Sequence, residues 1–185
     1  MDQEAFQNMR IVGVEDGSFQ KGITRNALLV AVLLTGSKIE RVKACKITVD
    51  GLDATQGLCG LLIDWKFDAI LLAGVSFAGF NVIDPEELFE NFSKPVIVIS
   101  RTRPRNRAVK SALQKHFEDW QVRWKIFEKL GRVHKIVVSP WKSPVYMETV
   151  RGNVEWASNL VRALAVCSRV PEPLRVARLI ARGLS

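Results

Sequence analysis

The chain has 185 residues, so we expect residues 1–185 to form a single domain whose core needs no covalent staples. Its three cysteines, Cys45, Cys59 and Cys167, are odd in number and form no CxxC pair, which argues against a zinc site or a disulfide framework and is typical of the reducing cytoplasm. The net charge of +8 favours a polyanionic partner. The N-terminus is polar and acidic, and the chain contains no apolar run of about 18 residues, so we expect a cytoplasmic protein with no signal peptide and no membrane span.

The N-terminal part of the chain predicts three β-strands joined by short turns. They are Arg10–Glu15, stopped by Asp16-Gly17; Ala27–Leu34; and Ile39–Val49, stopped by Asp50-Gly51. The third run alternates between polar and apolar residues with the period of a strand. Three consecutive strands with short connections form an antiparallel meander.

From Asp53 onward, the pattern predicts helices alternating with strands. Asp53 followed by Gln56, and Asp84 followed by Pro85, are typical helix starts. The expected elements are a helix from Asp53 to about Trp65, a strand at Ala69–Ala73, a loop to Asn81, a short helix from Asp84, a strand at Pro95–Ser100, one long or two nearly continuous helices over Val109–Leu130, a strand at His134–Ser139, and helices over about 154–166 and 172–182.

This order of elements predicts an α/β fold with a mixed sheet of the ribonuclease H-like type, flanked by helices. In that type the first strand is central and pairs with the second and the fourth, so an antiparallel three-strand meander is joined to parallel strands. A doubly wound, Rossmann-like sheet is the alternative. It is disfavoured because no helix separates the first three strands.

Four acidic residues follow strands whose carboxyl ends are expected at one edge of the sheet. Glu15 and Asp16 end the first strand, Asp50 ends the third, and Asp53 lies one turn further on. Clustered carboxylates suit a hard cation such as Mg²⁺ or Mn²⁺, which can activate water against a phosphodiester. The structural alternatives are turns at the two Asp-Gly pairs and a helix cap at Asp53.

Two further segments follow strands that end at the same edge. The glycine-rich loop from Gly74 to Asn81 offers Phe77, Gly79, Phe80 and Asn81 for a stacked base, although its phenylalanines could equally fill the core. The segment after Ser100 contains Arg101, Arg103 and Arg105 and no acid, which suits phosphate contacts but is also typical of a solvated face.

The C-terminal helix is expected to be amphipathic. Leu174, Ala177 and Ala181 repeat at helical spacing, so this helix could dock on the core or on a second copy of the chain in a homodimer. Arg175, Arg178 and Arg182 on the same helix could touch phosphate, although docking of the helix explains the pattern best.

Four segments together resemble a known family. They are Val12–Gly17, Val49–Thr55, Phe77–Asp84 with the sequence FAGFNVID, and Pro171–Ala177 with the sequence PEPLRVA. In this order they resemble the archaeal family labelled endonuclease dU, and the resemblance covers nearly the whole chain. The family is related to endonuclease V, which implies a ribonuclease H-like fold and metal-dependent cleavage of DNA near deaminated bases, deoxyuridine in particular.

The resemblance to endonuclease V is incomplete at the metal ligands. The first acid of that pattern corresponds to Glu15 or Asp16. The second falls near Asp53 to Gln56, and the third on Ala73 or Gly74, which have no carboxylate. Asp50, Asp53 or Asp84 would have to substitute.

Three functional hypotheses follow. The first is a metal-dependent endonuclease acting on deaminated DNA, with Glu15, Asp16, Asp50 and Asp53 at its catalytic site. The second is a non-catalytic nucleic-acid-binding protein that has lost the metal site, and the third is a small-molecule enzyme or scaffold that uses the Gly74–Asn81 loop.

Overall fold

A seven-stranded mixed sheet forms the centre of the protein, with strand order β3-β2-β1-β4-β7-β9-β8. The computed structural model describes residues 3–140 and 143–185. The strands of this sheet are β1 (Arg10–Asp16), β2 (Asn26–Thr35), β3 (Lys38–Thr48), β4 (Ala69–Leu72), β7 (Val96–Ser100), β8 (His134–Val137) and β9 (Pro144–Val150). β1 pairs with β2 antiparallel and with β4 parallel, and β4 pairs with β7 parallel, so the predicted central position of the first strand is confirmed.

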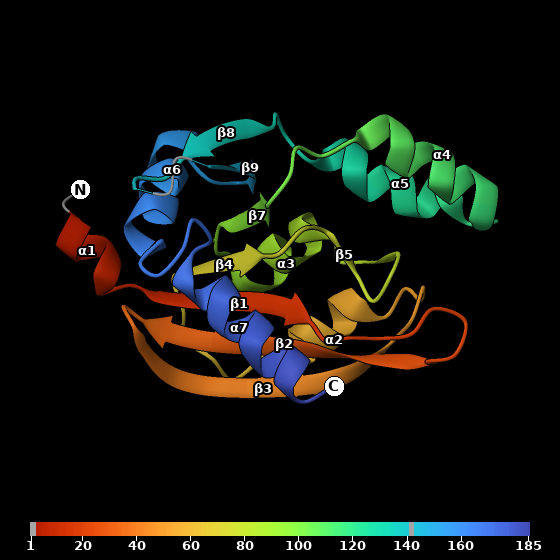
Figure 1. Ribbon diagram of the computed structural model, residues 1–185, viewed down its shortest axis with the longest axis horizontal. Coiled ribbons are helices and arrows are strands. Elements are labelled where there is room, and N and C mark those ends of the chain that lie inside the picture. The colour runs from red at the N-terminus through yellow and green to blue at the C-terminus, as the bar shows by residue number, and fades with distance from the viewer. Residues whose placement is uncertain (1–2, 141–142) are drawn as a thin grey trace.

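Helices cover both faces of the sheet (Figure 1). They are α1 (Gln3–Gln7), α2 (Ala54–Leu62), α3 (Pro85–Phe92), α4 (Asn106–His116), α5 (Trp120–Lys129), α6 (Val154–Leu164) and α7 (Glu172–Gly183). One core lies between the sheet and α2 to α5, and the other lies between the sheet and α1, α6 and α7. Alternate residues of β1 divide between them: Val12 and Val14 belong to the first core and Ile11 to the second.

Helix α7 lies across β1 and β2 at very short range (Figure 1). Gly13 makes this possible, because a Cβ atom at Gly13 would come within 2.3 Å of the backbone carbonyl of Pro173. The α7 side chains of Leu174, Ala177 and Ala181 are buried between the helix and the sheet. The C-terminal helix was predicted to dock on the core or on a second copy of the chain. In the structure it packs on the chain's own sheet.

The second half of the sheet differs from the sequence prediction. Strand β9 was not predicted, and it lies antiparallel between β7 and β8, so the predicted strand from His134 is not a direct neighbour of β7. Of the two alternatives predicted for Val109–Leu130, the structure shows two helices: the pattern is broken at Phe117, whose backbone is extended (φ −134°, ψ 126°), and α4 and α5 pack on each other. The loop after β4 contains a small hairpin of β5 (Ser76–Phe77) and β6 (Asn81–Val82).

No helix within residues 3–140 and 143–185 combines the length and the apolar composition that crossing a bilayer requires.

Replacing Gly13 with alanine should destabilise the fold, because the added methyl group overlaps the backbone of Pro173. We expect the free energy of unfolding to fall by about 1–3 kcal/mol, measured by urea denaturation. Gly60→Ala is the matched control, since a Cβ at this exposed helical position meets no atom within 4 Å and alanine favours a helix by about 0.5–1 kcal/mol. Equal denaturation midpoints for the two variants would contradict the close packing of α7 on β1.

Candidate functional site

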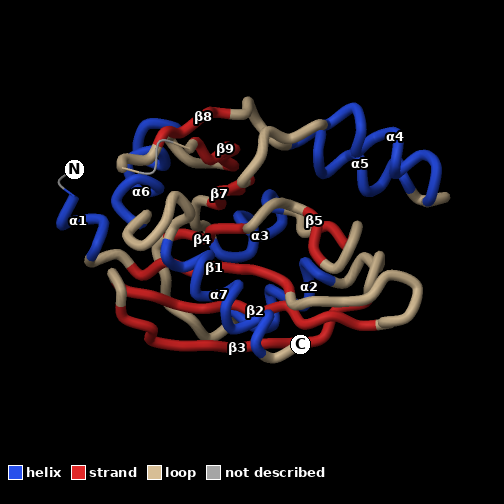
Figure 2. The backbone as a smooth tube through the Cα atoms, in the orientation of Figure 1, coloured by secondary structure: helices blue, strands red, loops and turns tan. Residues whose placement is uncertain are grey.

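The predicted functional segments meet at one edge of the sheet, where β1, β4 and β7 end. The loops that follow these parallel strands gather on one side of the molecule (Figure 2). β3 ends at the same edge, since its last residue, Thr48, is paired with Asn26 at the start of β2. The carboxyl ends of parallel strands are where α/β sheets usually bind ligands.

Glu15 and Asp16 lie at this edge, but adjacent residues of a strand point to opposite faces of the sheet. Glu15 lines a cavity beneath α7 together with Leu174 and Arg178. Asp16 faces the other way, and its Oδ2 accepts a hydrogen bond from the backbone N–H of Ala78 at 2.6 Å. The two carboxylates therefore do not converge on one point.

Asp50 stabilises the loop that follows β4. Its backbone has a positive φ of 57°, its N–H donates to the carbonyl of Ala78, and its Oδ1 accepts from the N–H of Phe80 at 2.8 Å. Gly79, with φ 89°, must lack a side chain there, since a Cβ would lie 2.2 Å from Oδ1 of Asp50. The carboxylate of Asp50 is thus used to shape the loop.

Asp53 and Asn81 form a second structural link. Asp53 accepts hydrogen bonds from the backbone N–H and the hydroxyl of Thr48 and from the Asn81 side chain. Partial burial acts to raise the pKa of Asp53, but these hydrogen bonds outweigh it and hold the pKa below its ordinary value. Asn81 is fully buried, and its Oδ1 accepts from the N–H of Ala54 at the start of α2. Asp53 makes no side-chain cap to that helix.

The aromatic residues of the loop do not form an open stacking surface. Phe77 is 1% exposed and belongs to the hydrophobic core. Phe80 is half-buried and packs edge to face on Phe117, with ring centroids 5.5 Å apart. Among the four predicted base-binding residues of this loop, Gly79 alone is exposed.

Arg123, which the sequence pattern does not distinguish, links α5 to the loop that contains Gly51 and to the loop that contains Phe80. It is 4% exposed, and its Nη1 donates to the carbonyls of Gly51 and Phe80 at 2.8 and 2.7 Å. Asp119 forms a salt bridge with the same guanidinium, and this pairing holds the pKa of Asp119 below its usual value. A helical arginine carries no sequence signal that distinguishes this buried role from a solvated one.

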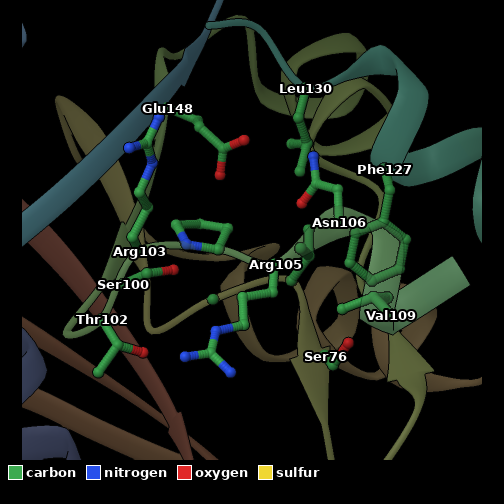
Figure 3. Close-up of a pocket in the computed structure, with 13 residues that line it drawn as sticks. Ser76, Ser100, Thr102, Arg103, Arg105, Asn106, Val109, Phe127, Leu130 and Glu148 are labelled. Carbon is green, nitrogen blue, oxygen red and sulfur yellow. The ribbon is translucent and has the colours of Figure 1, made fainter. Parts of the chain in front are cut away.

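The three predicted arginines border two cavities. Arg101 lines the cavity that contains Glu15, which has a volume of about 280 Å³. Arg103 and Arg105, both exposed, line a larger cavity of about 560 Å³ on the α4–α5 side (Figure 3). The two cavities share Ser100 and Thr102. The structure therefore brings the predicted arginines to the same edge as the carboxylates.

Glu15 has the most unusual electrostatic environment at this edge. Burial, and secondarily the charge of Asp16, raises the pKa of Glu15 to about 7, although Arg178 and Arg182 partly offset the shift. Oε1 lies 4.0 Å from Nη1 of Arg178, and the buried Oε2 has no hydrogen-bond partner within the described residues. A buried carboxylate oxygen without a partner is costly and is therefore a candidate ligand-binding group.

The predicted cluster of three or four carboxylates does not occur in the described part of the chain, where no three His, Cys, Asp or Glu side chains are placed to hold a metal ion. The physical reason is that Asp50 and Asp53 bind loop backbone and Asp16 points away from Glu15. These residues do not fit an all-protein metal cage. The partnerless oxygen of Glu15 does fit Mg²⁺ held in the manner of phosphoryl-transfer sites, by one or two carboxylates plus substrate phosphate and water.

Replacing Glu15 with glutamine should stabilise the protein above neutral pH. Because the folded-state pKa is raised from 4.5 to about 7, the folded state binds more protons than the unfolded state between these values, so wild-type stability falls as pH rises through this window. At 1.36 kcal/mol per pKa unit, glutamine should gain up to about 3 kcal/mol at pH 8 relative to pH 4. Thermal melts of both proteins from pH 4 to pH 8 measure this difference, and a constant gap would contradict the raised pKa.

Comparison with known proteins agrees with this architecture. The model of the endonuclease dU family matches residues 7–185. A UPF0215 protein of Methanosarcina mazei is 35% identical over 182 residues, covering 96% of this chain and 91% of that protein. A UPF0215 protein of Pyrococcus furiosus is 34% identical over 184 residues, covering 96% and 93%.

Solved structures show the same fold. A protein of unknown function from Archaeoglobus fulgidus superposes with a TM-score of 0.84 at 28% identity, covering 95% of this chain and 98% of that one. Endonuclease V from Ciona intestinalis, crystallised with a 23mer DNA containing an inosine followed by a ribo-adenosine, gives a TM-score of 0.60 at 14% identity, covering 98% and 93%. The fold is thus that of endonuclease V, as the sequence predicts, and the chain belongs to the endonuclease dU family.

Proposed function

We propose that this protein is an endonuclease that cleaves DNA beside a deaminated base, with deoxyuridine as the lesion. The observation that carries the proposal is the partnerless carboxylate oxygen of Glu15, which lies in a cavity at the carboxyl edge of the sheet with Arg101 and Arg178 on its walls. Membership of the endonuclease dU family and a fold shared with endonuclease V support the same reaction class.

The side chains at this edge have separate roles in the proposal. Arg101, Arg103 and Arg105 bind backbone phosphates, since guanidinium groups match phosphate oxygens. Glu15 provides the carboxylate for a divalent ion, and Asp16 holds the Ala78 loop in place beside it. Bound Mg²⁺ or Mn²⁺ would lower the pKa of a water molecule and neutralise charge on the phosphodiester.

Cleavage of a labelled duplex that contains one deoxyuridine, with and without Mg²⁺ or Mn²⁺, tests the proposal. Glu15→Gln should lower the cleavage rate by about 100-fold or more, a loss typical of removing a catalytic carboxylate. Asp16→Asn should lose less, because asparagine retains an oxygen for the N–H of Ala78. Glu155→Gln, at an exposed position on α6, is the control and should cleave as the wild type does. Undiminished cleavage by folded Glu15→Gln would remove Glu15 from the mechanism.

A non-catalytic nucleic-acid-binding protein is the second candidate. The observation that favours it is the cation already beside Glu15: Nη1 of Arg178 lies 4.0 Å from the carboxylate, within the region that a metal ion would need. Under this alternative the wild type binds the same duplex with or without metal and leaves it intact.

Both candidates predict that the arginines at the carboxyl edge account for part of the salt dependence of binding. Each phosphate contact contributes about 0.9 to the slope of log K against log salt, so the double variant Arg103→Gln/Arg105→Gln should reduce that slope by about 2. The charge-matched control is Lys38→Gln/Arg41→Gln, because β3 begins at the opposite edge of the sheet. Binding isotherms between 50 and 200 mM salt measure the slope for each protein. A slope for Arg103→Gln/Arg105→Gln equal to that of the control variant would exclude Arg103 and Arg105 from the interface.

A further inference from the structure

The cavity that contains Glu15 holds more positive than negative charge. Among the described residues that line it, Glu15 is the one acid, and Arg101 and Arg178 are two bases. Arg101 belongs to the segment after β7 and Arg178 to α7, so the two guanidinium groups come from different elements of the fold. A surplus of positive charge suits an anion, and guanidinium groups match the oxygens of a phosphate.

The ion pair between Arg178 and Glu15 is loose. Nη1 of Arg178 lies 4.0 Å from Oε1 of Glu15, which is longer than a hydrogen bond of about 2.7–3.2 Å. Arg175, one turn earlier on α7, is held differently: its Nε donates to Glu172 at 2.8 Å, and its Nη2 donates to the other carboxylate oxygen. The side chain of Arg178 is also 33% exposed, so its guanidinium is free to change partner.

Two ligands of opposite charge would compete with this pair in different ways. A divalent cation bound to Glu15 would lie close to the guanidinium of Arg178, and like charges at short range repel strongly where water is excluded. A phosphate in the cavity would attract the same guanidinium and draw it away from the carboxylate. The position of Arg178 therefore decides which of the two ligands can bind first.

We propose that Arg178 is a phosphate-binding residue that exchanges partners when DNA binds. In the free protein it neutralises Glu15, and in the complex it turns to a backbone phosphate that Arg101 also contacts. The carboxylate of Glu15 is then free to hold a divalent ion. This exchange rests on the proposed function, because the phosphate that enters the cavity belongs to the DNA substrate.

The exchange makes DNA and metal bind cooperatively. Without DNA, Glu15 already has a cation beside it, so a metal ion gains little from the carboxylate. With DNA, the phosphate and the ionised carboxylate of Glu15 repel each other until a divalent ion lies between them. Each ligand therefore strengthens the binding of the other by the same factor, since coupling between two binding sites is reciprocal.

The test is the affinity for Mn²⁺, followed by the loss of the electron paramagnetic resonance signal of the aqueous ion. The duplex carries one deoxyuridine and phosphorothioate linkages that slow cleavage, and duplex alone is the blank. At pH 8.5, protons compete little for Glu15, whose pKa is about 7. The wild type should bind Mn²⁺ about tenfold more tightly with the duplex than without it. Arg178→Gln should bind Mn²⁺ more tightly than the wild type does without the duplex, and should gain little when the duplex is added.

A second measurement, made without divalent metal, follows the phosphate contact alone. Arg178→Gln should lower the slope of log K against log salt by about 0.9, the contribution of one phosphate. Arg178→Lys keeps the positive charge and should resemble the wild type in both measurements. Arg162→Gln, at an exposed position on α6, removes one charge elsewhere and is the matched control. Thermal melts check that each variant is folded.

The outcomes separate the partner exchange from the proposed function. If the wild type binds Mn²⁺ equally with and without the duplex, or if Arg178→Gln keeps the wild-type dependence on the duplex, the exchange is wrong and the endonuclease stands. If the wild type binds Mn²⁺ in neither state, metal-dependent cleavage is wrong as well. A salt slope for Arg178→Gln equal to that of the wild type would remove Arg178 from the phosphate site.

Discussion

The close packing of α7 on β1 is the constraint on which the carboxyl edge depends. Helix α7 can lie directly on the strand only because Gly13 has no side chain to meet Pro173. Two residues further along β1, Glu15 is covered by the same helix, and Arg178 approaches its carboxylate. One missing Cβ therefore sets the burial, the raised pKa and the cationic neighbour of the residue that we place at the centre of the proposed reaction.

The acidic residues of this edge divide by whether the fold already uses their oxygens. Asp50 and Asp53 accept hydrogen bonds from loop backbone, so their carboxylates are satisfied and stabilising. Glu15 is buried with little compensation, since its Oε2 has no hydrogen-bond partner within the described residues, and this costs stability. Natural proteins accept such a cost mainly at functional sites. The unsatisfied carboxylate of Glu15 therefore provides a better guide to function than the number of acids at the edge.

Periodicity predicted the three-strand meander, the central first strand and the helix starts, because these depend on local alternation and on connections too short to allow other pairings. The same reasoning missed β9, since Pro144–Val150 does not alternate in polarity and contains Glu148 at a core position. Periodicity also could not assign different roles to Glu15 and Asp16. The residues that distinguish them, Arg178 and Ala78, are distant from them in sequence. Phe77 was equally compatible with a ligand surface and with the core until the hairpin fold of its loop placed it inside.

The two cavities lie on opposite faces of the sheet and meet where β7 ends, at Ser100 and Thr102. In the proposed function, a DNA backbone along this edge would meet arginines of both cavities, Arg101 at one and Arg103 and Arg105 at the other. The segment that follows β7 carries Arg101, Arg103 and Arg105, so the side chains that we propose to bind the DNA backbone lie where the two cavities meet.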